Sequence, residues 1–154
     1  MISKACQVSL RDVNEENVRA ICNLSVRQEQ IDYVVSTSVA IAEAAYSTQD
    51  WLKAIYADDT PVGLAVVRKK STNPRCSLWR LMVDARYQGL NFGSRAIDLL
   101  VQEIKDDPTI DEFLTSVVAG EHSPQKFYQR LGFELTGETF EGEAVMRLPL
   151  RTRT

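Results

Sequence analysis

A strand, a glycine-containing loop and a long amphipathic helix follow one another between residues 77 and 105, and this succession restricts the fold more than any other feature. Backbone N–H groups in the loop and in the first helical turn lack partners, and the helix dipole favours negative charge there. The segment therefore predicts an anion site that suits a pyrophosphate, although its glycines are equally compatible with a plain tight turn. The buried face of the helix is expected to consist of Ala96, Ile97, Leu100, Val101 and Ile104.

The segments around this unit predict a mixed sheet with flanking helices, an α/β (α+β) architecture. The strands before the helix are expected to pair antiparallel, and the strand after it to run parallel to the strand before it. A helix that begins at Ser123 and Pro124 and ends at Gly132 precedes a final hairpin. The expected strands cover residues 8–11, 51–57, 62–67, 77–83, 112–118, 133–140 and 144–148.

Two further helices are expected between the first and second strands. Asn14 is a suitable N-cap for a helix over residues 15–24, whose apolar side chains keep the helical period. A serine and threonine cluster at residues 36–38 suits the start of a helix over residues 39–46. The polar residues 27–32 separate the two helices.

Length and composition indicate one domain over residues 1–154 and exclude several classes of protein. The net charge of −3 disfavours binding to nucleic acid, which needs a basic surface. Three scattered cysteines, Cys6, Cys22 and Cys76, and a single histidine, His122, predict reduced thiols and no ordinary metal site. The chain has neither an N-terminal apolar segment nor a long apolar run, so we expect a cytoplasmic protein that does not enter a membrane.

The loop at residues 88–93 can be compared with known phosphate-binding loops. An ATP-type loop requires Gly-Lys followed by Ser or Thr, but Gly93 is followed by Ser94 and Arg95. A dinucleotide-type loop requires three spaced glycines early in a chain of alternating strands and helices, and neither condition is met. The remaining pattern, Gln or Arg followed by x-x-Gly-x-Gly or Ala, is typical of loops that bind acyl-CoA.

Two segments together carry a resemblance to a known family. Residues 83–93 (VDARYQGLNFG) and 127–133 (FYQRLGF) resemble the two signature motifs of the GNAT acyltransferase superfamily, at the expected separation. The resemblance extends over nearly the whole chain. Residues 28–34, with Ser36 and Ala44, and residues 137–146 are similar to bacterial spermine/spermidine acetyltransferases.

This resemblance implies an N-acetyltransferase that moves the acetyl group of acetyl-CoA, its co-substrate, to a primary amine of a small molecule such as a polyamine. It implies a cleft where the central parallel strands splay apart and, by family analogy, a homodimer. Pantetheine would bind the backbone of Leu81, Met82 and Val83. The remaining cofactor-binding residues implied by the resemblance are Gln88, Gly89, Leu90, Asn91, Phe92, Gly93 and Ser94, whose amides would hold the pyrophosphate, and Glu121.

Tyr128 matches the tyrosine that, in this family, protonates the departing CoA thiolate. Amine attack on a thioester passes through an oxyanion that a backbone N–H, here that of Val83, can stabilise. A phenol with a pKa of about 10 stays protonated at neutral pH and can then serve as general acid. The alternative for Tyr128 is a half-buried aromatic side chain on an amphipathic helix.

The chain departs from the family pattern at several positions. Asn91 replaces the first glycine of the loop, but asparagine tolerates positive φ, so the turn can survive. Glu121 replaces an asparagine that faces pantetheine and could face the amine instead. The substrate pocket is expected to include Tyr33, Trp79 and Glu121, with packing as the alternative role for Trp79.

No general base is identified from the sequence. The strand before the loop lacks the carboxylate that polyamine acetyltransferases often carry there. Glu121, Asp32, Glu29 or a chain of water molecules could accept the proton of the amine. His122 is interpreted as a surface residue.

Two alternative functions remain open at this point. The same fold could acetylate a peptide amino terminus, a lysine or an antibiotic amine. It could also be an acyl-CoA-binding module without activity, which Asn91, Glu121 and the missing carboxylate would favour.

Overall fold

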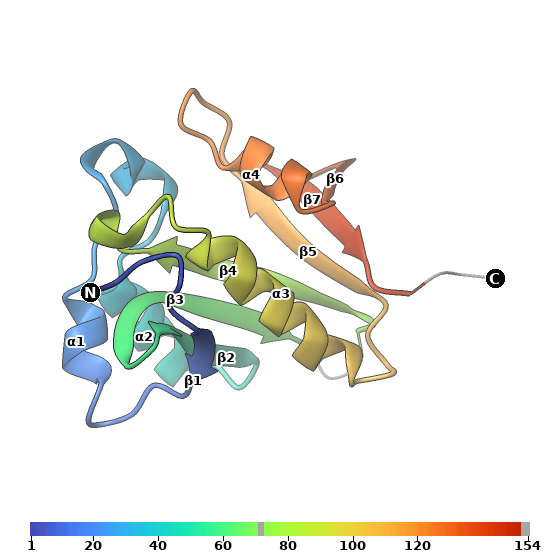
Figure 1. Cartoon of the computed structure of the whole chain (residues 1–154). Coiled ribbons are helices and arrows are strands. Elements are labelled where there is room, and N and C mark those ends of the chain that lie inside the picture. The colour runs from blue at the N-terminus through green and yellow to red at the C-terminus, as the bar shows by residue number, and fades with distance from the viewer. Residues whose placement is uncertain (71–72, 152–154) are drawn as a thin grey trace.

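The computed structural model describes residues 1–70 and 73–151, and these residues form one seven-stranded sheet with helices on both faces (Figure 1). The sheet order is β1-β2-β3-β4-β5-β7-β6. Along the chain the elements are β1 (Val8–Arg11), α1 (Val18–Cys22), η1 (Gln28–Tyr33), α2 (Thr37–Ala45), β2 (Asp50–Ala57), β3 (Thr60–Lys69), β4 (Arg75–Val83), η2 (Ala85–Tyr87), α3 (Phe92–Lys105), β5 (Glu112–Val117), α4 (Gln125–Arg130), β6 (Glu134–Phe140) and β7 (Glu143–Pro149).

The sheet is split between its two central strands. Every neighbouring pair is antiparallel except β4 and β5, which run parallel. These two strands are paired at only three positions, where residues 75–77 meet residues 112–114. Beyond Ser77 and Leu114 they diverge, as Figure 1 shows for the ends of β4 and β5. The expected mixed sheet with a splayed parallel pair is therefore confirmed.

A bulge interrupts β4 next to this divergence. Val66 pairs with Arg80, but its neighbour Val67 pairs with Leu78, so Trp79 is an extra residue in β4. Bulges of this kind bend a strand and redirect its side chains, and they are frequent beside active sites. The residue pattern of this strand does not predict the bulge.

Two apolar clusters hold the helices on the sheet. One cluster lies under α3 and contains the buried side chains Ala96, Ile97, Leu100 and Ile104, with Val101 packed at its margin. The expected buried face of this helix is confirmed. The second cluster joins α1 and α2 to the opposite face of β2, β3 and β4. Both faces of the β1–β4 half of the sheet are therefore covered.

The first helix is shorter than expected. The Asn14 side-chain oxygen accepts hydrogen bonds from the N–H groups of Glu16 and Asn17, at 2.9 and 3.0 Å. These bonds hold residues 14–17 in a turn, so the helix begins only at Val18. Conversely, residues 28–33, within and beside the polar stretch, form the 3₁₀ helix η1.

Two expected helix signals are confirmed. The Ser36 hydroxyl accepts a hydrogen bond from the N–H of Val39 at 3.2 Å and caps α2. Gly132 follows α4 with a φ of 98°, the left-handed conformation that favours glycine. Within the described part of the chain, none of the helices combines the length and the apolar character needed to cross a membrane.

Candidate active site

A cleft of about 1040 Å³ lies between the diverging strands, at the upper end of the range for small-molecule sites. Its walls come from both halves of the sheet. One wall consists of β4, the following loop and the start of α3, and the other contains the end of β5 and α4. Residues of η1 and of the β6–β7 hairpin complete the lining.

The main chain of β4 faces this cleft with backbone groups that have no partner strand on the β5 side. The N–H of Asp84 donates to the carbonyl of Val62 at 2.8 Å. Because hydrogen-bonded pairs alternate along an antiparallel ladder, Met82 also points its backbone groups toward β3. The Met82 carbonyl indeed lies only 2.3 Å from the position a Cβ would take on Gly63. The backbone N–H and C=O groups of Leu81 and Val83 therefore point into the gap left by β5.

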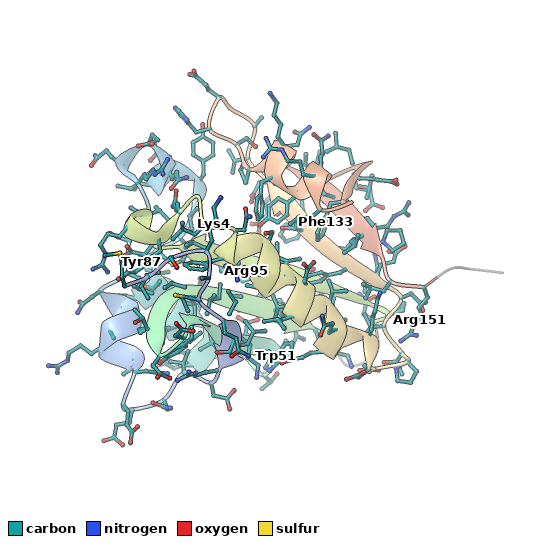
Figure 2. The ribbon with its side chains drawn as sticks, viewed as in Figure 1. Lys4, Trp51, Tyr87, Arg95, Phe133 and Arg151 are labelled. Atoms are coloured by element: carbon teal, nitrogen blue, oxygen red, sulfur yellow. The ribbon has the colours of Figure 1, made fainter. Side chains whose placement is uncertain are left out.

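The loop between β4 and α3 contains two residues with positive φ. Gly89 has a φ of 80°, and Asn91 has φ 65° and ψ 19°, in the left-handed region. The expected tolerance of asparagine at this position is confirmed. Arg95 in the first turn of α3 (Figure 2) donates to the carbonyls of Cys6 and Leu90, at 3.0 and 3.2 Å. These bonds fix the loop against the N-terminal segment, and the first residues of α3, Phe92, Gly93 and Ser94, line the cleft.

The carboxylate of Asp84 anchors the other end of the same loop. It accepts hydrogen bonds from the N–H groups of Ser25 and Arg86 and from the Arg86 guanidinium, at 2.8–3.0 Å. Burial alone would raise the pKa of Asp84, but these hydrogen bonds outweigh burial and hold the pKa below its usual value. The residue is thus a buried, ionised anchor that sequence reasoning did not single out.

Gln88 links this loop to η1. Its side-chain amide donates to the carbonyl of Val83 at 2.9 Å and to the side-chain oxygen of Gln30 at 2.8 Å. Gln30 also lines the cleft. This contact joins segments 58 residues apart in the chain, and the sequence offered no signal for it.

Tyr128 lies on α4 at the opposite wall and is 6% exposed. Its ring meets the rings of Phe127 and Phe133 edge to face, with centroids 5.1 and 5.4 Å apart, and Figure 2 shows Phe133 beside α4. Burial raises the pKa of Tyr128 to about 12, opposed by a hydrogen bond with Thr115. The phenol therefore stays protonated at neutral pH while it lines the cleft.

Trp79 lines the cleft from the bulge of β4 and is also firmly packed. The guanidinium carbon of Arg68 lies 3.7 Å from the centre of its ring, and the ring of Phe140 meets it edge-on at 6.0 Å. Arg68 is held by a two-pronged ion pair with the buried carboxylate of Asp50, at 2.6 and 3.0 Å. The two roles considered for Trp79, pocket wall and packing, thus coincide.

Tyr33 at the end of η1 reaches the other half of the sheet. A Cβ on Gly120, in the loop after β5, would lie 2.3 Å from the Tyr33 hydroxyl oxygen. Gly120 also has a φ of 152°. Gln30 is hydrogen-bonded to the β4–α3 loop and Tyr33 lies against Gly120, so η1 contacts both walls of the cleft.

The structure brings most of the expected site residues to this cleft. The exceptions are Leu90, whose side chain packs against the core under α3, and Glu121, which is exposed in the loop before α4. Of the candidate bases, Asp32 lines the cleft and Glu29 does not. The expected residues that line it are Tyr33, Trp79, Leu81, Met82, Val83, Gln88, Gly89, Asn91, Phe92, Gly93, Ser94 and Tyr128.

Other lining residues were missed or interpreted differently. Glu141 and Glu143, from the turn of the β6–β7 hairpin, add carboxylates to that of Asp32. Phe140 adds an aromatic side chain that is 46% exposed. His122, interpreted as a surface residue, is exposed and borders the cleft.

The sequence and the fold can be compared with known proteins. The profile of the acetyltransferase (GNAT) family matches residues 10–133. The chain is also similar to spermine/spermidine N(1)-acetyltransferase of Bacillus subtilis (strain 168), at 29% identity over 146 residues. That match covers 90% of this chain and 96% of the relative.

The fold is similar to those of solved acetyltransferases, among them two crystal structures with bound coenzyme A. One is an aminoglycoside 6'-N-acetyltransferase complexed with coenzyme A, with a TM-score of 0.75 and 14% identity; the match covers 96% of this chain and 99% of the other. The other is spermidine N-acetyltransferase from Vibrio cholerae in complex with CoA and spermine, with a TM-score of 0.67 and 17% identity. This match covers 94% of this chain and 96% of that one.

Proposed function

Because this chain belongs to the GNAT acetyltransferase family, we propose that it transfers the acetyl group of acetyl-CoA to a primary amine of a polyamine, with Tyr128 as general acid. The observation that carries the proposal is the composition of the cleft. Main-chain groups of β4 without a partner strand, the N-terminus of α3 and a buried, protonated phenol all border one space.

The described residues fit acetyl-CoA. Pantetheine contains amide groups, which can pair with the N–H and C=O groups of Leu81 and Val83 that face the cleft. The pyrophosphate would be held by backbone N–H groups from Gln88 to Ser94, at the start of α3. Leu90 would take part through its backbone only, since its side chain packs against the core. Glu121 is left out of the proposed site because it does not line the cleft.

Bound acetyl-CoA supplies the thioester carbon that the amine attacks. As the C–N bond forms, the carbonyl oxygen becomes an oxyanion, and the N–H of Val83 is proposed to stabilise it. The C–S bond then breaks, the nitrogen loses a proton to a base or to water, and the thiolate accepts a proton from Tyr128. The products are the N-acetylated amine and the free thiol, and Tyr128 regains its proton from solvent.

The raised pKa of Tyr128 affects the timing of this proton transfer. A thiol has a pKa of about 8.5, so full transfer from a phenol whose pKa burial has raised above its usual value of about 10 is uphill. A thiolate leaving inside the same cleft is also desolvated, and its pKa rises for the same reason. We therefore expect Tyr128 to donate a hydrogen bond while charge develops on sulfur and to release its proton late.

Two observations support a polyamine as the acceptor. The cleft is lined by the carboxylates of Asp32, Glu141 and Glu143, which suit a chain with several positive charges. The relative from Bacillus subtilis, matched over 90% of this chain, is named for spermine and spermidine.

A screen of acceptors tests the proposal. We expect CoA release with spermine and spermidine to exceed release with an aminoglycoside, free lysine and a peptide amino terminus, at equal concentration. Faster release with any of the last three would replace the polyamine by that acceptor. Calorimetry with CoA is the companion measurement. Binding without turnover on any amine would favour an acyl-CoA-binding module. Absence of binding would exclude both the acetyltransferase and the binding module.

The substitution Tyr128→Phe tests the general acid. Loss of proton donation should lower kcat by about 10²–10⁴-fold while the Kd for CoA changes little. Tyr46→Phe is the matched control, because Tyr46 is 94% exposed and does not line the cleft. If Tyr128→Phe retains the kcat of the original enzyme over the whole pH profile, Tyr128 has no part in the chemistry.

A further inference from the structure

We propose that Gln30 is a positioning residue for acetyl-CoA, acting through Gln88 on the cleft-facing carbonyl of Val83. Gln30 belongs to η1, whereas Gln88 belongs to the loop proposed to bind the cofactor. The inference rests on the proposed function, since it assumes that acetyl-CoA occupies the cleft between β4 and β5.

The first support is the complete use of the Gln88 amide. An amide NH₂ group has two hydrogens to donate. One is directed to the Val83 carbonyl at 2.9 Å and the other to the Gln30 side-chain oxygen at 2.8 Å. The side chain of Gln88 is therefore fixed between η1 and the end of β4, and Gln30 supplies one of its two attachments.

The second support is that Gln30 is itself fixed. Its side-chain oxygen accepts a second hydrogen bond, from the N–H of Arg27 at 3.1 Å, at the start of η1. The next residues, Ile31, Asp32 and Tyr33, line the cleft. The attachment of Gln88 is thus part of the same short helix that presents side chains to the cleft.

The third support is the direction of the Val83 carbonyl. This oxygen points away from β3, toward the space that a paired β5 would fill. A carbonyl oxygen has two lone pairs. Gln88 occupies one of them and leaves the other for an N–H of the ligand. By holding Gln88 in place, Gln30 fixes the orientation of the carbonyl and of the loop that follows it.

The direct test measures KM for acetyl-CoA in Gln30→Ala. Loss of one neutral hydrogen bond should raise this KM by about 3- to 10-fold, with kcat at saturation within about twofold. Gln30→Glu should keep a KM near the original value, because a carboxylate accepts both hydrogen bonds. Gln28→Glu adds the same charge to an exposed residue of η1 and serves as the control for charge alone.

Three further variants test the same contact from the side of Gln88. Gln88→Ala should raise KM by a similar factor, and the double variant Gln30→Ala/Gln88→Ala should be no worse than either single one. Gln88→Glu should be at least as damaging as Gln88→Ala, since it places a carboxylate against two acceptor oxygens. This asymmetry between Glu at position 30 and Glu at position 88 is specific to the proposed contact.

Several outcomes would overturn the inference. An unchanged KM in Gln30→Ala, additive effects in the double variant, or a lower melting temperature without any change in KM would each assign Gln30 a purely structural role. If the unmodified protein fails to bind CoA in calorimetry, the proposed function fails, and the inference fails with it. If the unmodified protein binds CoA and the variants keep its KM for acetyl-CoA, only the inference about Gln30 is rejected.

Discussion

At the scale of single residues, Asn91 shows how the loop can lack a glycine and keep its shape. Its φ of 65° lies in the left-handed region, which asparagine visits more readily than other residues with a Cβ. Its side chain caps nothing at the start of α3. The backbone conformation is therefore the property that the position requires, and the side chain is free to vary among residues that tolerate it.

Substitutions at Asn91 should follow this backbone requirement. Asn91→Gly should leave stability and the Kd for CoA nearly unchanged, whereas Asn91→Val should cost about 1–2 kcal/mol, because a branched Cβ opposes positive φ. Denaturant unfolding and CoA titration measure both quantities. The control is Asn23→Val, at an exposed position with a φ of −84°. Equal losses at positions 91 and 23 would mean that the left-handed conformation is not the cause.

At the scale of elements, η1 is the segment that joins the two walls of the cleft. Gln30 is bonded to Gln88 on the β4 side, and Tyr33 lies against Gly120 on the β5 side. A glycine is needed at position 120 for two reasons, the φ of 152° and the nearness of the Tyr33 hydroxyl. The contact therefore depends on a missing side chain in one segment and an aromatic ring in another.

Gly120→Ala should displace Tyr33 and weaken binding of the amine. The new Cβ would lie 2.3 Å from the Tyr33 hydroxyl oxygen, so we expect a several-fold rise in KM for the amine and a stability loss of about 1–3 kcal/mol. Tyr33→Phe in the same chain should recover part of the loss, since the nearest remaining ring atom is 3.1 Å away. Steady-state kinetics and thermal unfolding are the measurements.

Gly137→Ala is the control that separates the collision with Tyr33 from the backbone strain of an alanine with positive φ. Gly137 has a φ of 84°, and a Cβ there would meet no atom within 4 Å. It should lose stability but keep its KM for the amine. A Gly120→Ala variant that behaves like Gly137→Ala would show that Tyr33 does not press on this loop.

The elements differ in how well the sequence predicts them, for physical reasons. The helix α3 was predicted because its buried side chains repeat with the helical period, a local property. The 3₁₀ helix η1 is polar and six residues long, and its contacts come from residues distant in sequence, such as Gln88. The motif likewise could not show that Leu90 turns its side chain to the core or that Glu121 lies outside the lining of the cleft.

At the scale of the whole molecule, the split sheet determines where the cleft lies. The pairing of β4 with β5 ends at Ser77 and Leu114, and the bulge at Trp79 follows immediately. The two halves of the sheet are nevertheless one layer, joined at the narrow end of the gap by three residue pairs. On the β3 side the pairing continues past the bulge to Val83, so the split costs β4 only one of its two partners.

Amide exchange should show this asymmetry along β4. The N–H of Met82 faces β3 and should exchange slowly with and without CoA. The N–H groups of Leu81 and Val83 face the gap and should exchange faster in the free protein, then slow down when CoA is added. Residue-resolved exchange by NMR measures all three. Equal protection of Leu81 and Met82 in the free protein would contradict the assigned direction of the strand.

The split sheet also affects how readily one molecule can aggregate with another through strand pairing. Unpaired strand edges are templates on which another chain can add a strand. Here the unpaired edge of β4, residues 78–83, faces the shorter one of β5, residues 115–117, across a gap that closes at one end. The outer edges of the sheet are poorer templates for strand pairing, because β1 has only four residues and the pairing of β6 is broken between Leu135 and Thr139. The unpaired edge of β4 therefore lies inside the molecule. A thin, extended ligand can reach it, whereas a strand of another chain cannot easily pair with it.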